Sequence, residues 1–528
     1  MDEVKKAIYN LKPKTSCGDD KISNKLLKSI CQEVALPLKL IINQMFSCGA
    51  FPNKLKISKV TPLYKKDENY LLNNYRPISI LPSVSKVFER IMYNQIYEYF
   101  TKLQLFFDSQ YGFRAKHSTE YAALELVDRI ILAMDQNKFP VNIFMDLSKA
   151  FDTLDHKILL HKLDHYGFKT KSINLMRSYL SNRLQYVEYN SVKSDFSTVV
   201  CGVPQGSILG PLLFIIYIND LPKIVPNFQF IIYADDTALY TTINNFNSDS
   251  TDVTLINSEL SSIYDWLKLN KLSLNVSKTK AMIFSTPQRQ VTYPEIYLNE
   301  IKIDFVTTFN YLGIIIDEKL NFKTHIDMIT NKISRVVGIM KKLKNFLPKS
   351  ALIHVYNSLI LSHINYGLVV WGGYLRANER LEILQRSAIR TMNNLKYNAH
   401  TDPYFKKDCL LKLKDLRALH DFTFCYKFIH NLLPRYFHKN LKYTIPHLHF
   451  TRQVDQLRIP SVRHDFARNG ITYRYPVVYN NISENLTNFR EKIITHSLFG
   501  FKYYVKTVLI QSYKSACLVR NCPSCPNT

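Results

Sequence analysis

The sequence FQFIIYADDTALY, at residues 228–240, decides the fold that we expect for this chain. Two apolar segments rich in β-forming residues flank Ala234-Asp235-Asp236, so the stretch predicts a β-hairpin with two acids at its tip. Because both flanks are strongly apolar, we expect the hairpin to be buried while its tip faces a cleft. An Asp-rich turn is common in itself, so the two acids indicate a functional site only if further charged groups lie nearby.

A third acid stands earlier in the chain. Residues 141–145 predict a strand, and Asp146 follows as that strand ends, before an amphipathic helix that stops near Gly167. Taken alone, Asp146 reads as an acid stabilised by a helix N-terminus. If it lies beside Asp235 and Asp236, however, each pair of carboxylates about 4 Å apart repels by roughly 4 kcal/mol at an effective dielectric near 20. Such a cluster needs cations.

The ligand chemistry of these acids favours magnesium. Oxygen-only ligands suit Mg²⁺, which keeps waters and takes substrate phosphates. Two such ions about 4 Å apart activate a 3′-hydroxyl and stabilise a pyrophosphate leaving group, which is nucleotidyl transfer. We therefore expect two Mg²⁺ ions, with Mn²⁺ as the substitute, on Asp146, Asp235 and Asp236. The only CxxC sequence, at Cys522 and Cys525, lacks a second ligand pair, so zinc is not expected there.

A glycine-containing loop, residues 202–211, lies between the acidic segments. Its glycines allow the backbone to approach a ligand closely, and Pro211 is well placed as a first helical residue. The alternative is an ordinary loop before a buried helix. Lys278 and Lys280, after the hairpin, are candidate phosphate partners and equally plausible surface lysines.

The flanking segments predict a mixed architecture. Residues 85–100 predict an amphipathic helix, and residues 60–65 and 75–78 predict short strands that carry basic side chains. Residues 141–242 alternate strand, helix and hairpin, which favours an α+β core, whereas the pattern becomes helical beyond about residue 320.

Composition indicates a polyanionic partner. The chain of 528 residues has 69 Lys and Arg against 43 Asp and Glu, a formal net charge of +26, and 46% hydrophobic residues for its cores. Nine scattered cysteines favour a reducing compartment. No signal or transit peptide pattern is present, and the longest apolar run, Leu212 to Ile218, is far shorter than the roughly 20 residues that cross a bilayer. We expect a soluble protein without stable membrane association.

Six ordered blocks resemble the fingers and palm of a reverse transcriptase (RNA-directed DNA polymerase) of a non-LTR retrotransposon, of the jockey-like kind. The blocks are Asn74-Tyr75-Arg76-Pro77-Ile78-Ser79, Gln110-Tyr111-Gly112-Phe113-Arg114, Asp146 with Lys149-Ala150-Phe151-Asp152, Pro204-Gln205-Gly206-Ser207, Tyr233-Ala234-Asp235-Asp236 and Tyr311-Leu312-Gly313. The resemblance implies an α+β right-hand polymerase with fingers, a palm of antiparallel sheet plus helices, and a helical thumb. The regions expected are an N-terminal helical extension (1–58), fingers and palm (59–317), thumb (318–440) and a C-terminal region without an assigned role (441–528).

The resemblance also implies a role for each matching residue. Asp146, Asp235 and Asp236 would be the catalytic acids that bind two Mg²⁺ ions, and Phe151 would be the steric gate that excludes a ribose 2′-hydroxyl. The other implied positions are the nucleotide pocket (Gln205 and Gly206), the cations that hold the triphosphate (Arg76 and Lys65), the general acid for pyrophosphate (Lys278 or Lys280), the primer grip (Tyr311, Leu312 and Gly313) and a further nucleic-acid contact (Gly112, Phe113 and Arg114). The implied partners are an RNA template, a DNA primer and dNTPs, in a ribonucleoprotein of the cytoplasm and nucleus.

The sequence departs from the family pattern in places. Residues 15–20 resemble only loosely the Pro-Gly-Pro-Asp-Gly segment at the start of such domains, and the chain begins almost there, so we expect no apurinic-type endonuclease in it. Neither an RNase H pattern nor a zinc knuckle is found. The alternatives are a group II intron maturase, an RNA-binding protein without catalysis, and an RNA-dependent RNA polymerase, which commonly has Gly-Asp-Asp in the hairpin and aspartate where Phe151 stands.

Overall fold

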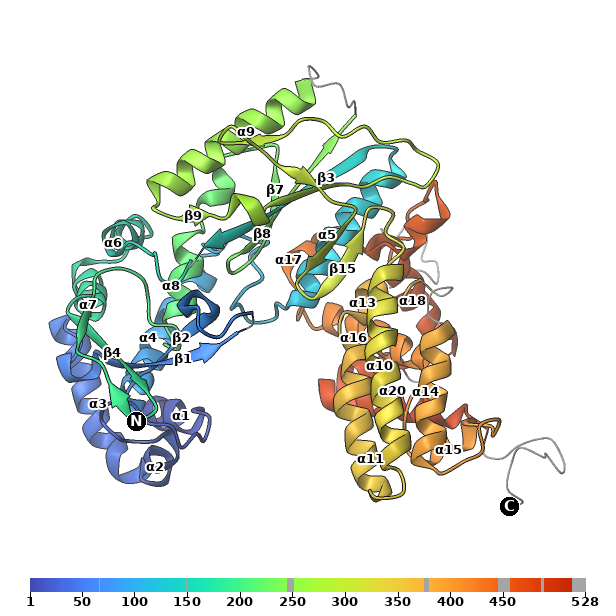
Figure 1. Cartoon of the computed structure of the whole chain (residues 1–528), viewed down its shortest axis with the longest axis horizontal. Helices are drawn as coiled ribbons and strands as arrows, with labels where there is room; N and C mark the ends of the chain where they lie inside the picture. Colours follow the sequence, from blue (N-terminus) through green and yellow to red (C-terminus); the bar gives the residue numbers. More distant parts are fainter. Residues whose placement is uncertain are drawn as a thin grey trace.

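The computed structural model describes residues 1–65, 67–148, 150–244, 251–374, 379–444, 456–485 and 489–514. The elements form an arch in Figure 1, with a central sheet at the top and two limbs below it. One limb holds the N-terminal helices and a second sheet, and the other is built from the helices that follow residue 320. The α+β fold class predicted from the sequence is confirmed.

The central sheet has the strand order β13-β10-β3-β8-β7, with β9 also paired to β3. Its strands are β3 (Phe139–Ser148), β7 (Gln229–Tyr233), β8 (Asp236–Ile243), β9 (Ser273–Leu274), β10 (Lys280–Ile283) and β13 (Asp304–Phe305). Pairing is antiparallel except between β10 and β13. The predicted hairpin at residues 228–240 is therefore confirmed as β7 and β8.

The prediction that a strand ends just before Asp146 is wrong by a few residues. Strand β3 continues to Ser148, because Leu147 pairs with Leu274 and Ser148 with Ser273 of β9. A partner strand distant in the sequence thus extends β3 beyond its apolar run. Asp146 lies inside a paired strand, and its backbone is held on both sides.

Alternating side chains of the central sheet enter two different hydrophobic cores, as the period of two in a strand requires. Val141, Ile143 and Met145 of β3 lie in one core with α8 (Gly210–Tyr217) and α9 (Thr251–Leu269). Phe144 lies in the other core with α5 (Thr119–Asp135) and the helical limb. Helix α8 is buried except at Pro211, as its apolar sequence predicts.

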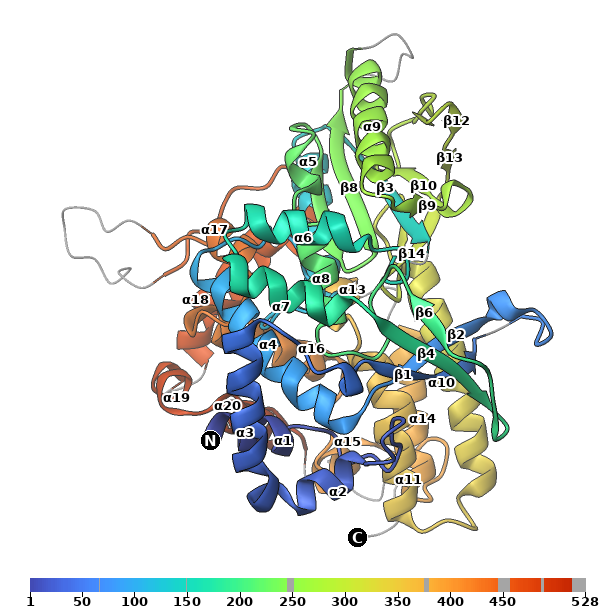
Figure 2. The same ribbon diagram turned by 90° about the vertical axis from the view of Figure 1, so that its left-hand side faces the viewer.

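The first limb combines helices with a five-stranded sheet of order β2-β1-β4-β5, in which β6 also pairs with β4 (Figure 2). Its strands are β1 (Ile57–Tyr64), β2 (Tyr75–Ile80), β4 (Arg183–Tyr189), β5 (Val192–Lys193) and β6 (Ser197–Val199), and its helices are α1 (Asp2–Tyr9), α2 (Asn24–Ser29), α3 (Cys31–Cys48), α4 (Ser83–Lys102), α6 (His156–His165) and α7 (Thr170–Leu180). Helix α4 confirms the amphipathic helix predicted at residues 85–100. It shares one core with α1, α3 and α8.

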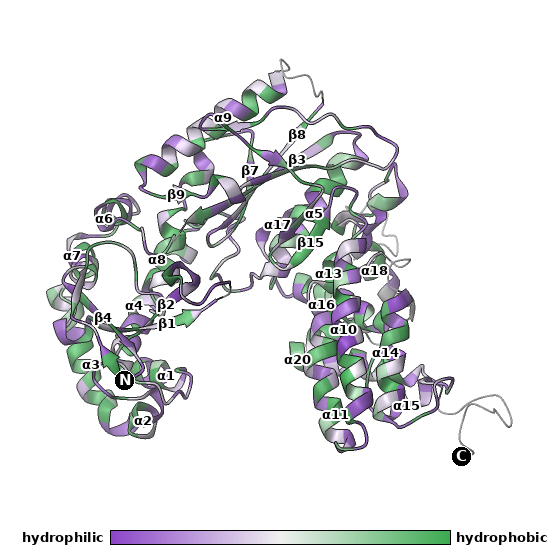
Figure 3. Ribbon diagram, in the orientation of Figure 1, coloured by the Kyte–Doolittle hydropathy of each residue, from purple (hydrophilic) through white to green (hydrophobic). Residues whose placement is uncertain are grey.

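The second limb confirms the helical pattern predicted beyond residue 320. Its longer helices are α10 (Lys323–Leu343), α14 (Glu379–Met392), α16 (Leu413–Ile429), α18 (Ile471–Asn485) and α20 (Leu498–Gln511). Hydrophobic and hydrophilic residues alternate along α10 and α14 in Figure 3, as amphipathic helices require. Within the described ranges, no helix combines the length and apolar character needed to cross a membrane.

The segment beyond residue 440, to which the sequence assigned no role, packs onto this limb and onto α5. The amide of Ile471 donates to Asp128 Oδ1 at 2.7 Å, and Arg474 is buried in an ion pair with Asp421 of α16. Phe501 and Val505 of α20 are fully buried in the same core. The described C-terminal helices therefore stabilise the second limb.

Candidate active site

Three acids lie together where β3 meets the β7–β8 turn. Asp146 is the direct cross-strand partner of Asp236, the first residue of β8, and Asp235 occupies the turn. Directly opposed residues of an antiparallel pair have Cβ atoms about 4.5–5.5 Å apart, and like charges there are destabilising. Ala234 adopts a left-handed backbone conformation with φ of 57°. The strained turn and the opposed carboxylates both point to a functional site.

Electrostatics at this turn favours a cation. Partial burial, together with the neighbouring charges of Asp235 and Asp146, raises the pKa of Asp236 to about 6, although its side chain reaches solvent. Burial likewise raises the pKa of Asp235, with a contribution from Asp146 in the same direction, whereas Arg76 and Lys65 lower it. Arg76 and Lys65, on and beside the β1–β2 sheet, are therefore close enough to stabilise the charged form of Asp235.

The structure distinguishes the two candidate lysines. Lys278 Nζ lies 3.1 Å from Asp146 Oδ2, while Lys280 Nζ lies 2.8 Å from Asp304 Oδ2 at the outer edge of the sheet. Lys278 is positioned by Asn275, whose amide donates to the carbonyl of Asp146 at 2.8 Å and whose side chain accepts from the Lys278 amide. Of the two lysines, only Lys278 contacts a predicted catalytic acid.

The acidic turn rests on a segment that includes Gly112. A Cβ atom built on Gly112 would lie 3.0 Å from Ala234 Cα and closer still to its nitrogen, so only glycine fits without movement. Gln110 Oε1 accepts from the amides of Gly112 at 2.8 Å and of Ala234 at 3.3 Å. Gln110 is buried, and although it belongs to a block that resembles the family, no sequence pattern indicated that its side chain supports the turn.

Phe113 and Arg114, predicted with Gly112 as a nucleic-acid contact, differ in orientation. Phe113 is exposed and packs edge-to-face against Phe151 at 6.2 Å. The Arg114 guanidinium instead donates to the carbonyls of Phe107 at 2.7 Å and of Gln110 at 3.2 Å. Arg114 therefore holds its own loop together, and its contact with nucleic acid stays a prediction.

The loop at residues 204–207 links the segment after β3 to strand β2. Gln205 Nε2 donates to both carboxylate oxygens of Asp152, at 2.9 and 2.8 Å, and its carbonyl accepts from the Ser79 amide at 2.8 Å. Gly206 has φ of 135°, and a Cβ there would overlap the Ser79 carbonyl oxygen. This close approach fixes the loop against β2, the strand that carries Arg76.

Phe151, the predicted steric gate, lies next to this loop. Its ring is 4.7 Å from that of Phe214 in α8 and also contacts Phe113. The Phe151 carbonyl accepts from the Val203 amide at 2.9 Å. The partly exposed ring is thus held between a buried helix and the Gly112–Phe113 segment.

The turn at residues 311–313 connects β14 (Thr308–Tyr311) and β15 (Ile314–Asp317). Tyr311 is buried with its ring 5.4 Å from Phe144 of the central sheet. The hydroxyl of Tyr366, from the helical limb, donates to the Leu312 carbonyl at 2.5 Å. Gly313 faces the same Tyr366 ring. The turn is therefore fixed between the sheet and the second limb, and Tyr366 is a positioning residue that sequence patterns did not indicate.

Comparison with known families defines the class of this site. Residues 63–316 match the family of reverse transcriptases (RNA-dependent DNA polymerases), so the chain contains a reverse transcriptase domain, with the fold of a right-hand polymerase. The predicted resemblance to jockey-like non-LTR elements is also confirmed. The chain is 27% identical over 413 residues to the RNA-directed DNA polymerase from mobile element jockey of Drosophila melanogaster, covering 76% of this chain and 44% of the relative.

A second curated relative and a solved structure are also similar to this chain. The probable RNA-directed DNA polymerase from transposon BS of Drosophila melanogaster is 29% identical, covering 75% of this chain and 45% of the relative. The chain thus spans less than half the length of these curated relatives. Among solved structures, telomerase from Candida albicans in complex with a fragment of telomeric RNA aligns with a TM-score of 0.37 at 12% identity, covering 75% of this chain and 66% of that one.

Proposed function

We propose that this chain is an RNA-directed DNA polymerase that copies retrotransposon RNA into DNA by two-metal nucleotidyl transfer. The observation that carries the proposal is the pairing of Asp146 with Asp236 beside Asp235, inside a reverse transcriptase domain. The proposed partners are an RNA template, a DNA primer and dNTPs. Copying element RNA and inserting its product require a ribonucleoprotein in the cytoplasm and the nucleus, where we propose that the protein acts.

The donor set fits divalent metal ions. Asp146, Asp235 and Asp236 offer only carboxylate oxygens, which Mg²⁺ and Mn²⁺ prefer. Bound ions would lower the pKa of the primer 3′-hydroxyl and neutralise the charge that develops on the phosphates. Among the described residues, no three His, Cys, Asp or Glu side chains converge closely enough to hold a metal by themselves. Substrate phosphates and waters would therefore complete the coordination, as is usual for Mg²⁺.

The remaining residues of the site have proposed roles that follow from their positions. Arg76 and Lys65 are proposed to hold the triphosphate, because their charges already act on Asp235. Lys278 is proposed to donate a proton to the leaving pyrophosphate, since its ammonium group reaches Asp146. Because this ion pair is exposed to solvent, the lysine would be free to turn toward a phosphate when the acids bind cations.

We propose that aromatic and glycine-containing segments of the site recognise the sugar and the primer. Phe151 would contact the ribose and exclude a 2′-hydroxyl, with Gln205 and Gly206 lining the same nucleotide pocket. The exposed ring of Phe113 would stack on template bases, as aromatic side chains commonly do. The turn at residues 311–313 would hold the primer end, since it is fixed by Tyr366.

Primer extension by the purified chain tests this proposal. The assay uses an RNA template and a DNA primer with Mg²⁺, and compares dNTPs with rNTPs. Asp235→Asn should abolish extension, whereas Asp304→Asn, which also removes a carboxylate beside the central sheet but one that forms an ion pair with Lys280, should leave it intact. Equal activity of both variants would exclude Asp235 as a catalytic acid. Absence of extension by the native chain, despite RNA binding, would support the non-catalytic alternative.

The sugar preference provides a second readout. Phe151→Val should admit rNTPs, because removing the ring opens the space beside Phe214 that a 2′-hydroxyl needs. An active variant that still rejects rNTPs would show that Phe151 is not the steric gate. Efficient rNTP use by the native chain would instead favour an RNA polymerase.

A further inference from the structure

A basic pocket lies on the second limb, away from the three acids. Its volume is about 410 Å³, and its walls come from α14, the following loop, α15 (Asp402–Lys407) and the start of α16. In Figure 1, α14 and α15 lie on the side of the second limb that faces away from the β1–β2 sheet. The pocket therefore does not belong to the proposed active site.

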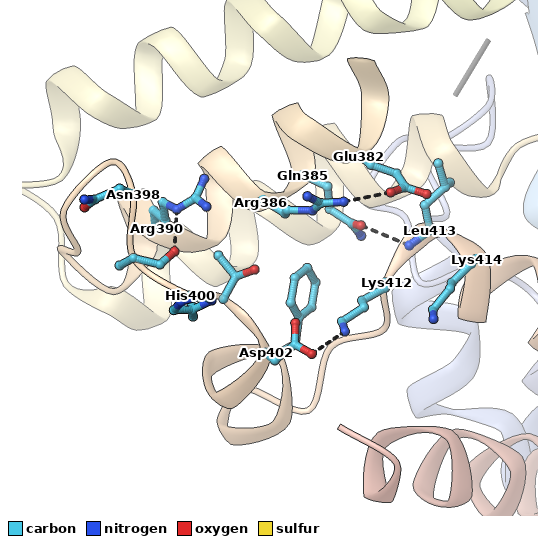
Figure 4. A pocket seen from close by; sticks show the side chains of 13 residues that line it. Glu382, Gln385, Arg386, Arg390, Asn398, His400, Asp402, Lys412, Leu413 and Lys414 are labelled. Atoms are coloured by element: carbon cyan, nitrogen blue, oxygen red, sulfur yellow. Dashed lines mark hydrogen bonds and ion pairs between the residues drawn. The ribbon is translucent and has the colours of Figure 1, made fainter. Parts of the chain in front are cut away.

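The charges in this pocket do not balance. Four cations line it, Arg386, Arg390, Lys412 and Lys414, against two acids, Glu382 and Asp402, which leaves an excess of two positive charges. Figure 4 shows how the acids are used: Arg386 pairs with Glu382 at 2.9 Å, and Lys412 pairs with Asp402 at 2.7 Å. In the part of the chain that the structure describes, no carboxylate pairs with Arg390 or Lys414. The excess charge thus resides on these two residues.

Arg390 lies where its positive charge is electrostatically unfavourable in the absence of an anion. Its guanidinium is half-buried and donates through Nε to the Ala399 carbonyl at 2.8 Å, which leaves its terminal nitrogens for another partner. Burial lowers the pKa of Arg390, and the like charge of Arg386, one helical turn away, lowers it further. Like charges at this spacing destabilise a helix. An anion bound between the two guanidinium groups would reverse both effects, and phosphate matches their forked donors.

The loop that closes the pocket carries exposed aromatic side chains. Tyr397 is 89% exposed, one of the most exposed large side chains of the described chain, and His400 at the pocket wall is also exposed. Aromatic rings beside cations suit single-stranded nucleic acid, because bases stack on the rings while phosphates pair with the charges. Inorganic phosphate or a small anion would gain nothing from Tyr397.

We propose that this pocket binds the phosphate backbone of single-stranded RNA, with Arg386, Arg390 and Lys414 on the phosphates and Tyr397 stacked on a base. The site is a second RNA contact, separate from the path of template and primer past the acids. It would tether RNA outside the region being copied. The proposal stands without the polymerase activity, because it depends only on the charge, burial and exposure of residues on α14, α16 and the connecting loop.

Binding of a labelled single-stranded RNA oligonucleotide to the full chain tests the pocket. The variant Arg386→Gln/Lys414→Gln removes two exposed charges, so the fold should be retained, whereas Arg380→Gln/Lys302→Gln removes two exposed charges outside the pocket. The pocket variant should bind RNA about tenfold more weakly than this control, and the slope of log affinity against log salt should fall by about 0.7 for each lost phosphate contact. Tyr397→Ala should weaken binding at least about fivefold without changing the salt slope.

Cross-linking on the native chain supplies an independent readout. RNA that contains 4-thiouridine should cross-link to a peptide within residues 386–414, and inorganic phosphate at matched ionic strength should not compete. Primer extension on a short template should be unchanged in the pocket variant. Equal affinity of the pocket and control variants, no cross-link in this peptide, or competition by phosphate as effective as by RNA would each overturn the proposal.

Discussion

Gly112→Ala is the sharpest test of how the acidic turn is supported. The added Cβ would lie 3.0 Å from Ala234 Cα and 3.1 Å from Ala234 Cβ, whereas ordinary contacts begin at 3.4 Å. The turn must then move by more than about 0.4 Å, the difference between 3.4 and 3.0 Å, because the backbone nitrogen is closer still. Catalytic groups must be held within about 0.5 Å, and a displacement near 1 Å costs about 10²-fold in rate.

We therefore expect Gly112→Ala to lower the rate of primer extension by about 10- to 100-fold, while overpacking costs only about 1–3 kcal/mol of stability. Gly338→Ala is the matched control: Gly338 lies in α10, and apart from its own stretch of helix backbone no described atom lies within 4 Å of its added Cβ, so this variant should be fully active and about 1 kcal/mol more stable. Urea denaturation measures the stabilities, and single-turnover extension measures the rates. A Gly112→Ala enzyme as active as the Gly338→Ala control would refute the reasoning.

Three further predictions concern the neighbouring groups. Lys278→Gln should slow extension by about 10²-fold and flatten the alkaline limb of the pH–rate profile, as loss of a general acid does, whereas Lys280→Gln should behave like the native chain because Lys280 pairs with Asp304. The pKa of Asp236 is raised to about 6, so the stability linked to its protonation is fully present below its unfolded pKa of about 3.9 and is lost as pH rises through about 6. In metal-free buffer at neutral pH, where Asp236 is charged and unfavourable, Asp236→Asn should therefore raise Tm. An unchanged Tm would contradict the predicted destabilisation by the charged carboxylate. Tyr366→Phe removes the hydroxyl that donates to the Leu312 carbonyl, so it should cost about 1 kcal/mol and raise the KM for primer–template more than it lowers kcat; an effect on stability alone would make the contact purely structural.

Local patterns in the sequence were sufficient for many elements of the fold. The continuous apolar, β-forming flanks of Asp235 and Asp236 predicted the buried β7–β8 hairpin. The spacing of residues 85–100 predicted α4, because burial of one helical face requires that period. The order of the motifs identified the family. The boundary after Asp146 was missed, because the partner that extends β3, Leu274, lies far along the chain.

The roles of individual polar side chains depended on the tertiary structure. The sequence did not distinguish Lys278 from Lys280, yet only Lys278 reaches Asp146. Arg114 matches the family pattern, yet its guanidinium binds carbonyls of its own loop. Likewise, no pattern indicated that Gln110 supports the acidic turn.

The sequence by itself indicated most of the secondary structure, the family and the three acids as candidate metal ligands, because these depend on the order and periodicity of residues along one chain. Only the tertiary structure decided which cations meet those acids, which glycine supports their turn, and where an excess of positive charge gathers on the second limb. The physical reason is that hydrogen bonds and ion pairs act over a few ångströms in space. Residues far apart in the sequence therefore acquire their roles only when the strands and helices have packed.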